Sequence, residues 1–370
     1  MTALALPSPH GPHQVGTQDL WLLDEDRTDP WRQGHHRELM ARLWYPVEPD
    51  AVDGGVPVGA VGCGGEAEPG GVEPGAVEPD PAALPAGYLP PEVAAHVLGM
   101  WAEEGEEFGP DLHAALAGVR VHAVRRPPAG DRPAPLVLLS PGLGEYAAGL
   151  TALAEDLASR GFLVAAVDHP YDAAAVRFPD GTLAPHHEPG DDLETRYLPT
   201  RVADLRLVLD RLLAPGSPLR VDPARIGAAG HSLGGAAVAE LARTDPRLCA
   251  VAVLDGSLYG EVLSTGLDLP VLLCGLTPPD PDDPDVLAGW DALWPRLRGP
   301  RRRTTVEGAG HMSATDFDAL AGPLGLRGPG DPDDVFNFGT LPEGHGLARV
   351  RRELAEFLAE HTARDLRPAL

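Results

Sequence analysis

Short apolar runs alternate with amphipathic stretches along most of this chain, and this alternation restricts the folds that it can form. The runs are continuous and rich in Val, Leu and Ala, which predicts strands buried on both faces. The stretches between them repeat apolar residues every three or four positions, which predicts helices. The predicted strands are Leu136–Leu139, Leu163–Val167, Arg225–Ala229, Ala250–Leu254 and Val271–Cys274, and the predicted helices are Leu150–Ser159, Thr200–Leu213 and Leu233–Arg243.

This order is typical of a mostly parallel central sheet with helices on both faces. Two further runs come first and need not be parallel to the others: Glu38–Pro46, which alternates and stops at proline, and Val119–Arg125. A final amphipathic helix is predicted over Leu347–His361. With 370 residues the chain is long enough to bury one large core without disulfides or metals. We therefore expect residues 1–370 to form a single α/β domain around one mixed sheet.

Residues 47–86 differ from the rest of the chain. Between Val47 and Ala86 the sequence is mostly Gly, Pro, Ala and Val, with eight acidic residues, no basic residue and no aromatic one. Such a segment cannot bury enough apolar surface to offset the entropy of ordering it. We interpret it as a disordered, low-complexity insertion, with an acidic recruitment segment as the alternative.

The charge balance and the residue types exclude several classes of function. The formal net charge is −26, whereas a nucleic-acid partner requires a basic face. All 29 basic residues are Arg, so the chain has no Lys for Ser-Lys dyads, Schiff bases or Walker-type phosphate loops. The three cysteines, Cys63, Cys249 and Cys274, have neither metal-binding nor redox spacing. We expect no metal and no cofactor.

No targeting or membrane-spanning segment is evident. Residues 1–14 lack a basic start and a long apolar core, and no stretch approaches the ~20 apolar residues of a membrane span. We expect a cytoplasmic protein without a transmembrane segment.

The run Gly-His-Ser-Leu-Gly at 230–234 lies directly between a predicted strand and a predicted helix. A sharp strand-to-helix turn flanked by glycines is the nucleophile elbow of the α/β hydrolases, in which the serine hydroxyl stands above the sheet. The following helix places its positive end at that hydroxyl. We therefore predict that Ser232 is the nucleophile, with an ordinary glycine-rich helix start as the alternative.

A serine nucleophile needs a base and an acid, and in this fold they follow it in the order Asp or Glu, then His. Three histidines lie downstream of Ser232. His311 follows the strand-like Arg303–Val306 in a glycine-rich loop, whereas His345 has no strand before it and His361 lies in the last predicted helix. We predict that His311 is the base.

The acid has two candidate positions. Asp255 ends the predicted strand Ala250–Leu254, so its carboxylate should emerge at the carboxyl edge of the sheet. The loop after the next strand holds Asp280, Asp282 and Asp283. That loop is the commoner position of the acid in this fold, but it is rich in proline and acid, as solvated loops are. Order and position favour Asp255 only slightly.

Two backbone N–H groups should form the oxyanion hole. One belongs to Leu233, the residue after the nucleophile. The other is assigned to Leu143, which lies between two glycines in the run Ser-Pro-Gly-Leu-Gly at 140–144, after the strand Leu136–Leu139. A plain glycine-rich turn is the alternative for that run.

The sequence indicates the walls of the substrate pocket less clearly than it indicates the catalytic residues. Glu145 and Tyr146 follow the predicted oxyanion turn, Ser140–Gly144, and are candidate pocket residues. Trp290 and Trp294 are four residues apart, so one helix face could present both to an acyl group, with packing of that helix on the sheet as the alternative. His186 and His187 could suggest a metal site, but no companion ligand has suitable spacing.

Several runs together resemble the type II platelet-activating-factor acetylhydrolases and their bacterial relatives. These runs extend over most of the chain outside residues 47–86, and they are Met40–Pro46, Ser140–Gly144, Asp156–His169, Ile226–Gly235 and Gly308–Phe317. The resemblance implies an α/β-hydrolase fold, a triad acid at Asp255, and oxyanion donors at Leu143 and Leu233. The 47–86 insertion and the lack of an export signal depart from the family pattern.

The expected function is hydrolysis of carboxylic esters of short acyl groups, through Ser232, His311, Asp255 and an acyl-enzyme. The expected substrate is a small ester or a phospholipid, and the resemblance implies an acetylated glycerophosphocholine. A peptidase or thioesterase on the same fold is one alternative. A catalytically silent hydrolase-fold binding module is the other.

Overall fold

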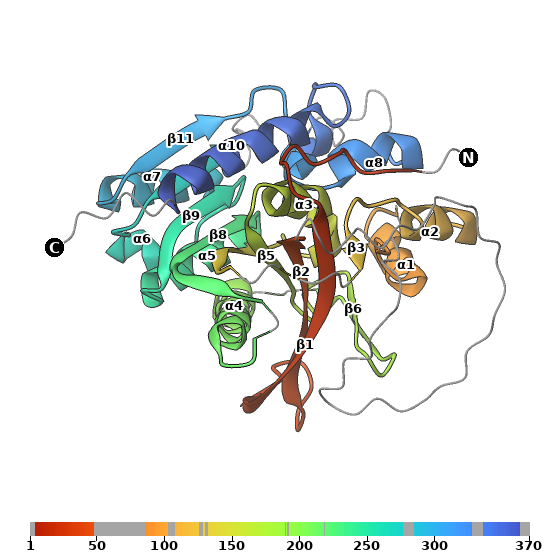
Figure 1. Cartoon of the computed structure of the whole chain (residues 1–370), viewed down its shortest axis with the longest axis horizontal. Helices are drawn as coiled ribbons and strands as arrows, with labels where there is room; N and C mark the ends of the chain where they lie inside the picture. The colour runs from red at the N-terminus through yellow and green to blue at the C-terminus, as the bar shows by residue number, and fades with distance from the viewer. Residues whose placement is uncertain are drawn as a thin grey trace.

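A nine-stranded sheet forms the centre of the molecule, with the strand order β11-β10-β9-β8-β4-β5-β2-β1-β3 (Figure 1). The computed structural model describes residues 4–47, 86–102, 108–125, 129, 132–188, 190, 192–217, 219–276, 285–327 and 336–362. The predicted insertion at 47–86 lies outside the described residues, apart from Val47 and Ala86 at its ends.

Six neighbouring strands of the sheet are parallel, as the sequence predicts. They are β4 (Ala134–Ser140), β5 (Leu163–Asp168), β8 (Val221–His231), β9 (Leu248–Leu254), β10 (Val271–Gly275) and β11 (Arg301–Thr305). Because parallel strands end at the same edge, the residues after β4, β8 and β9 come together there. These are the residues for which the sequence predicts catalytic roles.

The leading strands differ in part from the prediction. β2 (His36–Pro46) is the predicted run, and it pairs antiparallel with β5 and with β1 (Val15–Thr28), a strand that the sequence analysis missed. The predicted strand Val119–Arg125 was wrong over most of its length: Val124–Arg125 pairs, as β3, and Arg120 forms an isolated bridge with Ala5. The residues before β3 follow a helix and join an apolar cluster.

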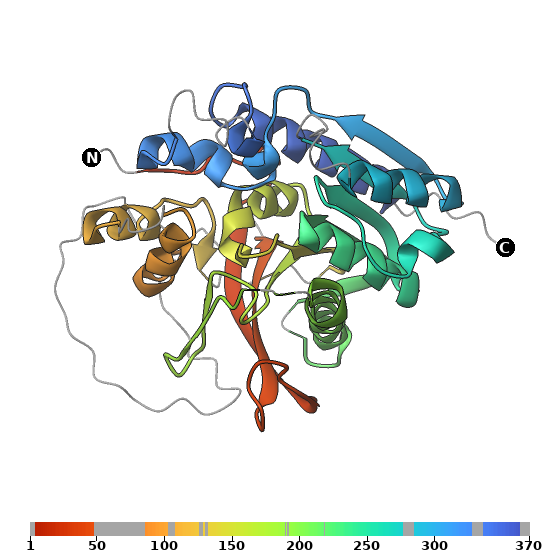
Figure 2. The same cartoon turned by 180° about the vertical axis from the view of Figure 1, so that it is seen from behind.

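Helices cover both faces of the sheet (Figures 1 and 2). Alternate residues of β4 enter opposite cores: Leu136 and Leu138 face one, Val137 and Leu139 the other. The first core is covered by α4 (Leu198–Leu213), α5 (Leu233–Thr244), α6 (Val262–Thr265) and α7 (Asp285–Leu293), and the second by α3 (Thr151–Ser159) and α10 (His345–His361). The predicted α/β architecture with both faces covered is confirmed.

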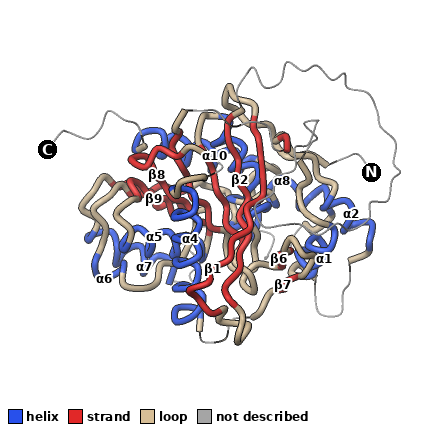
Figure 3. The backbone as a smooth tube through the Cα atoms, turned by 60° about the horizontal axis from the view of Figure 1, so that its bottom comes forward, coloured by secondary structure: helices blue, strands red, loops and turns tan. Residues whose placement is uncertain are grey.

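A third apolar cluster joins elements at one end of the sheet (Figure 3). Its elements are α1 (Pro91–Gly99), α2 (Pro110–Ala117), α8 (Phe317–Leu324) and the hairpin of β6 (Ala175–Arg177) and β7 (Leu183–Pro185). Short 3₁₀ or π turns occupy η2 (Ala147–Leu150), η3 (Leu193–Tyr197), η4 (Trp294–Arg296) and η5 (His311–Ala314). None of the helices that the structure describes is both long and apolar enough to cross a membrane.

Candidate active site

The predicted nucleophile lies where β8 turns into α5. Ser232 has φ 51° and ψ −126°, a conformation that non-glycine residues rarely adopt, and its N–H donates to the Leu254 carbonyl at 3.0 Å. Glycines make the turn possible. A Cβ on Gly234 would lie 2.0 Å from the Ser140 carbonyl oxygen, and one on Gly230 would lie 2.1 Å from the Gly234 oxygen. The strained turn keeps Ser232 partly exposed at the carboxyl edge of the sheet.

His311 and Asp255 meet beside this elbow. His311 Nδ1 donates to Asp255 Oδ2 at 2.8 Å, and the Leu276 N–H donates to Oδ1 of the same carboxylate at 2.7 Å. Burial by itself raises the pKa of Asp255, but the hydrogen bond and charge of His311 bring that pKa below its ordinary value. With Nδ1 donating to Asp255, His311 keeps Nε2 as its basic nitrogen.

The turn after β4 is anchored through its carbonyl groups. Buried Arg201 of α4 donates to the carbonyls of Pro141 at 2.5 Å and Gly142 at 2.9 Å, while its Nε donates to Asp172 at 2.6 Å. The Gly144 N–H in turn donates to the Asp172 carbonyl at 3.0 Å. Within the part of the chain that the structure describes, the N–H groups of Leu143 and Leu233 have no acceptor, so both can receive an oxyanion.

Sequence comparisons connect this site to named esterases. The family model for platelet-activating factor acetylhydrolase, isoform II, matches residues 112–198. The probable 1-alkyl-2-acetylglycerophosphocholine esterase of Arthroderma benhamiae is 26% identical over 240 residues, which are 60% of this chain and 59% of that protein. The platelet-activating factor acetylhydrolase of Canis lupus familiaris is 28% identical over 169 residues, covering 35% of this chain and 38% of its own. The chain thus matches about three fifths or less of each curated relative.

A solved structure matches over the full length. It is the ferulic acid esterase from Streptomyces cinnamoneus, with a TM-score of 0.77 and 35% sequence identity, covering 100% of this chain and 97% of that one. The chain belongs to the family of the type II platelet-activating-factor acetylhydrolases and their bacterial esterase relatives. The predicted α/β-hydrolase fold of this family is confirmed.

This family member contains a second Ser-His-Asp arrangement, one strand away from the elbow. Ser140 Oγ lies 3.1 Å from His169 Nε2, and His169 Nδ1 lies 3.0 Å from Asp204 Oδ2. All three side chains are fully buried, and Arg201 also donates to Ser140 Oγ at 3.3 Å. Burial lowers the pKa of His169, which favours the neutral ring. Ser140 is buried and lies in a regular strand. We therefore interpret this arrangement as an internal hydrogen-bond chain beneath the predicted oxyanion turn.

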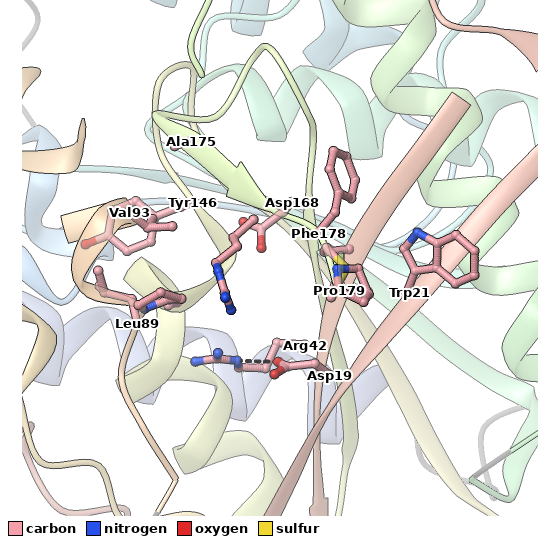
Figure 4. A pocket seen from close by; sticks show the side chains of 15 residues that line it. Asp19, Trp21, Arg42, Leu89, Val93, Tyr146, Asp168, Ala175, Phe178 and Pro179 are labelled. Carbon is pink, nitrogen blue, oxygen red and sulfur yellow. Dashed lines mark hydrogen bonds and ion pairs between the residues drawn. The ribbon is translucent and has the colours of Figure 1, made fainter. Parts of the chain in front are cut away.

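Two hollows lie near Tyr146, a predicted pocket residue. A cavity of about 380 Å³ opens over β1 and β2, with Tyr146, Asp168 and Phe178 around it and the Arg42–Asp19 ion pair at its base (Figure 4). A smaller hollow of about 30 Å³ is bordered by Tyr146, Gly144 and Met312, beside the predicted oxyanion turn. Tyr146 is therefore a wall shared by both hollows.

The other predicted residues take different places. Trp290 and Trp294 lie in α7 and at the start of η4, but neither borders the two hollows. Trp290 is buried and donates to the Gly256 carbonyl at 2.8 Å, and Arg301 lies over the Trp294 ring, which favours the packing alternative. His345 and His361 mark the two ends of α10.

The remaining predictions concern acids and metals. Asp280, Asp282 and Asp283 lie outside the described residues. Among the residues that are described, no group of three or more His, Cys, Asp or Glu side chains could hold a metal ion.

Three residues near the site were missed by the sequence analysis, namely Phe336, Met100 and His231, and a fourth, Glu145, was expected only as a pocket residue. Phe336 stacks on the His311 ring at 5.5 Å, and Met100 lies against Gly144; both are exposed and form an apolar rim. The other two, Glu145 and His231, lie between the oxyanion turn and His311. Their positions next to Gly144 and Ser232 in the sequence were the available signal, but sequence position alone does not indicate contact.

Proposed function

We propose that this chain is a serine esterase that releases short acyl groups from carboxylic esters through Ser232, His311 and Asp255. The observation that carries this proposal is the 2.8 Å bond between His311 Nδ1 and Asp255 beside a strained, partly exposed serine. The names of the related proteins, all esterases, support ester bonds over peptide or thioester bonds.

In the first step the Ser232 hydroxyl attacks the ester carbonyl carbon while its proton moves to His311 Nε2. The carbonyl oxygen becomes an oxyanion, which accepts hydrogen bonds from the Leu143 and Leu233 N–H groups. Asp255 stabilises the His311 cation. The bond to the alcohol oxygen then breaks as that oxygen takes the proton from His311, which leaves an acyl-enzyme.

In the second step water replaces the alcohol. Its proton moves to His311 while its oxygen bonds to the acyl carbon, and the same two N–H groups hold the new oxyanion. The bond to Ser232 breaks as the serine oxygen recovers its proton from His311. A carboxylic acid leaves and the starting enzyme is restored.

Short acyl groups are proposed from the size of the hollow beside the oxyanion turn. Its volume of about 30 Å³ is far smaller than the 380 Å³ of the cavity over β1 and β2, which favours small groups. The name of the Arthroderma benhamiae relative, an acetylglycerophosphocholine esterase, is consistent with that size. The name of the full-length structural match makes a ferulate ester the second substrate to examine.

The nucleophile is tested by comparing two serines. Ser232→Ala should lower kcat on p-nitrophenyl acetate by roughly 10⁶-fold and abolish labelling by a fluorophosphonate probe. Ser140→Ala is the matched control, since it removes the hydroxyl of the buried Ser-His-Asp arrangement, and its protein should still be labelled. Labelling that persists in Ser232→Ala and disappears in Ser140→Ala would reverse the assignment. A wild-type protein that is never labelled would support the silent binding module instead.

The substrate class is tested with p-nitrophenyl esters from acetate to palmitate, together with ethyl ferulate and an acetylated phospholipid. A kcat/KM that falls steeply beyond the shortest chains supports the proposal. A rise toward palmitate would indicate a lipase, and a clear preference for ethyl ferulate would indicate an aromatic acyl pocket. Faster cleavage of matched amides or thioesters would indicate one of the other hydrolases on this fold.

A further inference from the structure

A buried pair of opposite charges connects the oxyanion turn to the loop of the base. Glu145 Oε1 lies 2.8 Å from His231 Nδ1, with the Glu145 side chain 15% exposed and that of His231 fully buried. Neither residue belongs to the proposed triad or the oxyanion hole. A buried ion pair adds little net stability compared with apolar residues of the same volume, so its presence beside a reactive site calls for another role.

Glu145 holds the oxyanion turn. Its second oxygen, Oε2, accepts the Gly142 N–H at 2.6 Å, and the Glu145 N–H returns to the Gly142 carbonyl at 3.2 Å. The carboxylate lies so close over the turn that a Cβ on Gly142 would be 2.9 Å from its carboxyl carbon. Glu145 thereby fixes the residue directly before Leu143, whose N–H is a proposed oxyanion donor.

His231 holds the loop of the base. Its Nε2 donates to the carbonyl of His311 at 2.8 Å, and the two imidazole rings lie 4.5 Å apart at 44°. His231 also precedes Ser232 directly, as the last residue of β8. One side chain therefore contacts the backbone of the proposed base and adjoins the proposed nucleophile.

The surroundings shift the pKa of each member of the pair in the direction that favours its charged form. Burial by itself raises the pKa of Glu145, but His231 and the Gly142 N–H bring it below its ordinary value. Burial likewise lowers the pKa of His231, but Glu145, Asp255 and the His311 carbonyl raise it above its ordinary value. A charged His231 is attracted to the Glu145 carboxylate beside Nδ1 and donates from Nε2 to the His311 carbonyl.

We propose that Glu145 and His231 are positioning residues that hold the Leu143 N–H, Ser232 and His311 in one geometry for attack. The proposal rests on the proposed function, because it concerns the same site. The pair acts as one connected unit: the Gly142 N–H is bound to Glu145, Glu145 to His231, and His231 to the His311 carbonyl.

The first experiment measures Glu145→Ala with p-nitrophenyl acetate. We expect kcat to fall about 10²-fold, because a small displacement of an oxyanion donor has effects of that size. Because Glu145 also borders the smaller hollow, KM can rise as well, and the fall in kcat at saturating substrate is the readout that a positioning role requires. The rate of fluorophosphonate labelling at Ser232 should fall in parallel with kcat. Glu145→Gln, which keeps the shape and an acceptor for the Gly142 N–H, should recover part of the loss.

Glu155 provides the matched control. It is also a buried glutamate that accepts two backbone N–H groups, those of His122 at 2.9 Å and Ala123 at 2.6 Å, but these groups lie in the segment between α2 and β3. Glu155→Ala should lower the melting temperature as much as Glu145→Ala or more, and leave kcat within about twofold. If both alanine variants lowered kcat equally, the effect of Glu145 would be a general loss of stability and the proposal would be wrong.

A double variant tests whether the pair acts as one unit. Glu145→Ala with His231→Phe should lower kcat about as much as the worse single variant, because either change breaks the same connection. If the fold-losses in kcat of the two single variants multiplied in the double variant, the two residues would act independently and the proposal would be wrong. A kcat within about threefold of wild type in folded Glu145→Ala would also overturn the proposal.

Labelling by the fluorophosphonate probe distinguishes failure of the positioning role from failure of the proposed function. If the probe reacts at Ser232 in the wild type and equally fast in Glu145→Ala, only the positioning role fails. If Ser232→Ala is still labelled, the proposed function itself fails.

Discussion

At the scale of single residues, backbone strain marks the site. Ser232 and Asp255 have φ angles of 51° and 49°, and both follow parallel strands of the sheet. Strained residues persist where the surroundings determine them, and here Gly256 lies so close that a Cβ on it would be 2.3 Å from the Ser232 carbonyl oxygen. The proposed nucleophile and the proposed acid are thus held close to each other through the backbone.

Asp255→Asn should lower kcat on p-nitrophenyl acetate by about 10⁴-fold, because an amide can donate to His311 Nδ1 and stabilise the tautomer that lacks a basic Nε2. Asparagine tolerates the same positive φ, so the fold should persist. Asp245→Asn is the control: Asp245 is buried as well, but it pairs with Arg247 at the end of α5. A kcat within tenfold of wild type for Asp255→Asn would transfer the role of acid to another carboxylate.

Asp168 makes stability depend on pH. Burial raises its pKa from 3.8 to about 6, although the Ala147 N–H and Arg42 oppose the shift. The folded state therefore binds this proton more tightly than the unfolded chain does. The resulting stability is present at low pH and is lost as the pH rises through about 6.

Asp168→Asn removes this titration, because the amide stays neutral. It should raise the free energy of unfolding by up to about 3 kcal/mol at pH 8, and the gain should shrink toward zero below pH 4. Urea unfolding at the two pH values measures it. A gain that is equal at both values would mean that Asp168 does not titrate in this way.

At the scale of elements, α4 supports the oxyanion turn through Arg201. This guanidinium holds the carbonyls of Pro141 and Gly142 and is paired with buried Asp172. Arg201→Met would leave Asp172 buried without its partner, so the free energy of unfolding should fall by about 3–5 kcal/mol in urea titrations.

Asp172→Leu, added to Arg201→Met, should restore much of that stability, because the unpaired charge is gone. It should not restore kcat, since the carbonyls of the turn stay unanchored. A double variant with wild-type kcat would show that the turn needs no such support.

The sequence predicts some of these elements well and others poorly. The elbow is predictable because Gly230 and Gly234 flank Ser232 directly between an apolar strand and an amphipathic helix, where a sharp turn needs residues without side chains. β1 was missed because charged residues, Asp19 and Asp24–Arg27, flank its short apolar run Leu20–Leu23, as an antiparallel strand near the sheet edge allows. The roles of Arg201 and Glu145 were not predictable, since both act through contacts with residues distant in sequence or through side-chain direction.

At the scale of the whole molecule, charge opposes folding. The formal net charge is −26, so acidic side chains repel one another in the compact folded state. Dissolved salt screens this repulsion beyond about 10 Å at 0.1 M. Raising NaCl from 20 to 300 mM should therefore increase the melting temperature by about 1–3 °C. The same series with KCl should agree, because screening depends on ionic strength. A melting temperature that falls with both salts would mean that screened surface ion pairs outweigh the repulsion.

The buried Ser140–His169–Asp204 chain bears on how hydrolases are recognised. Its three side chains satisfy the interatomic distances of a catalytic centre, so a search by distance templates would retrieve two centres in one molecule. Ser140 differs from Ser232, because its hydroxyl accepts a hydrogen bond from a guanidinium and the residue ends a regular strand instead of standing in a strained turn. Templates that add solvent access and a positive φ at the serine would keep only the centre at Ser232.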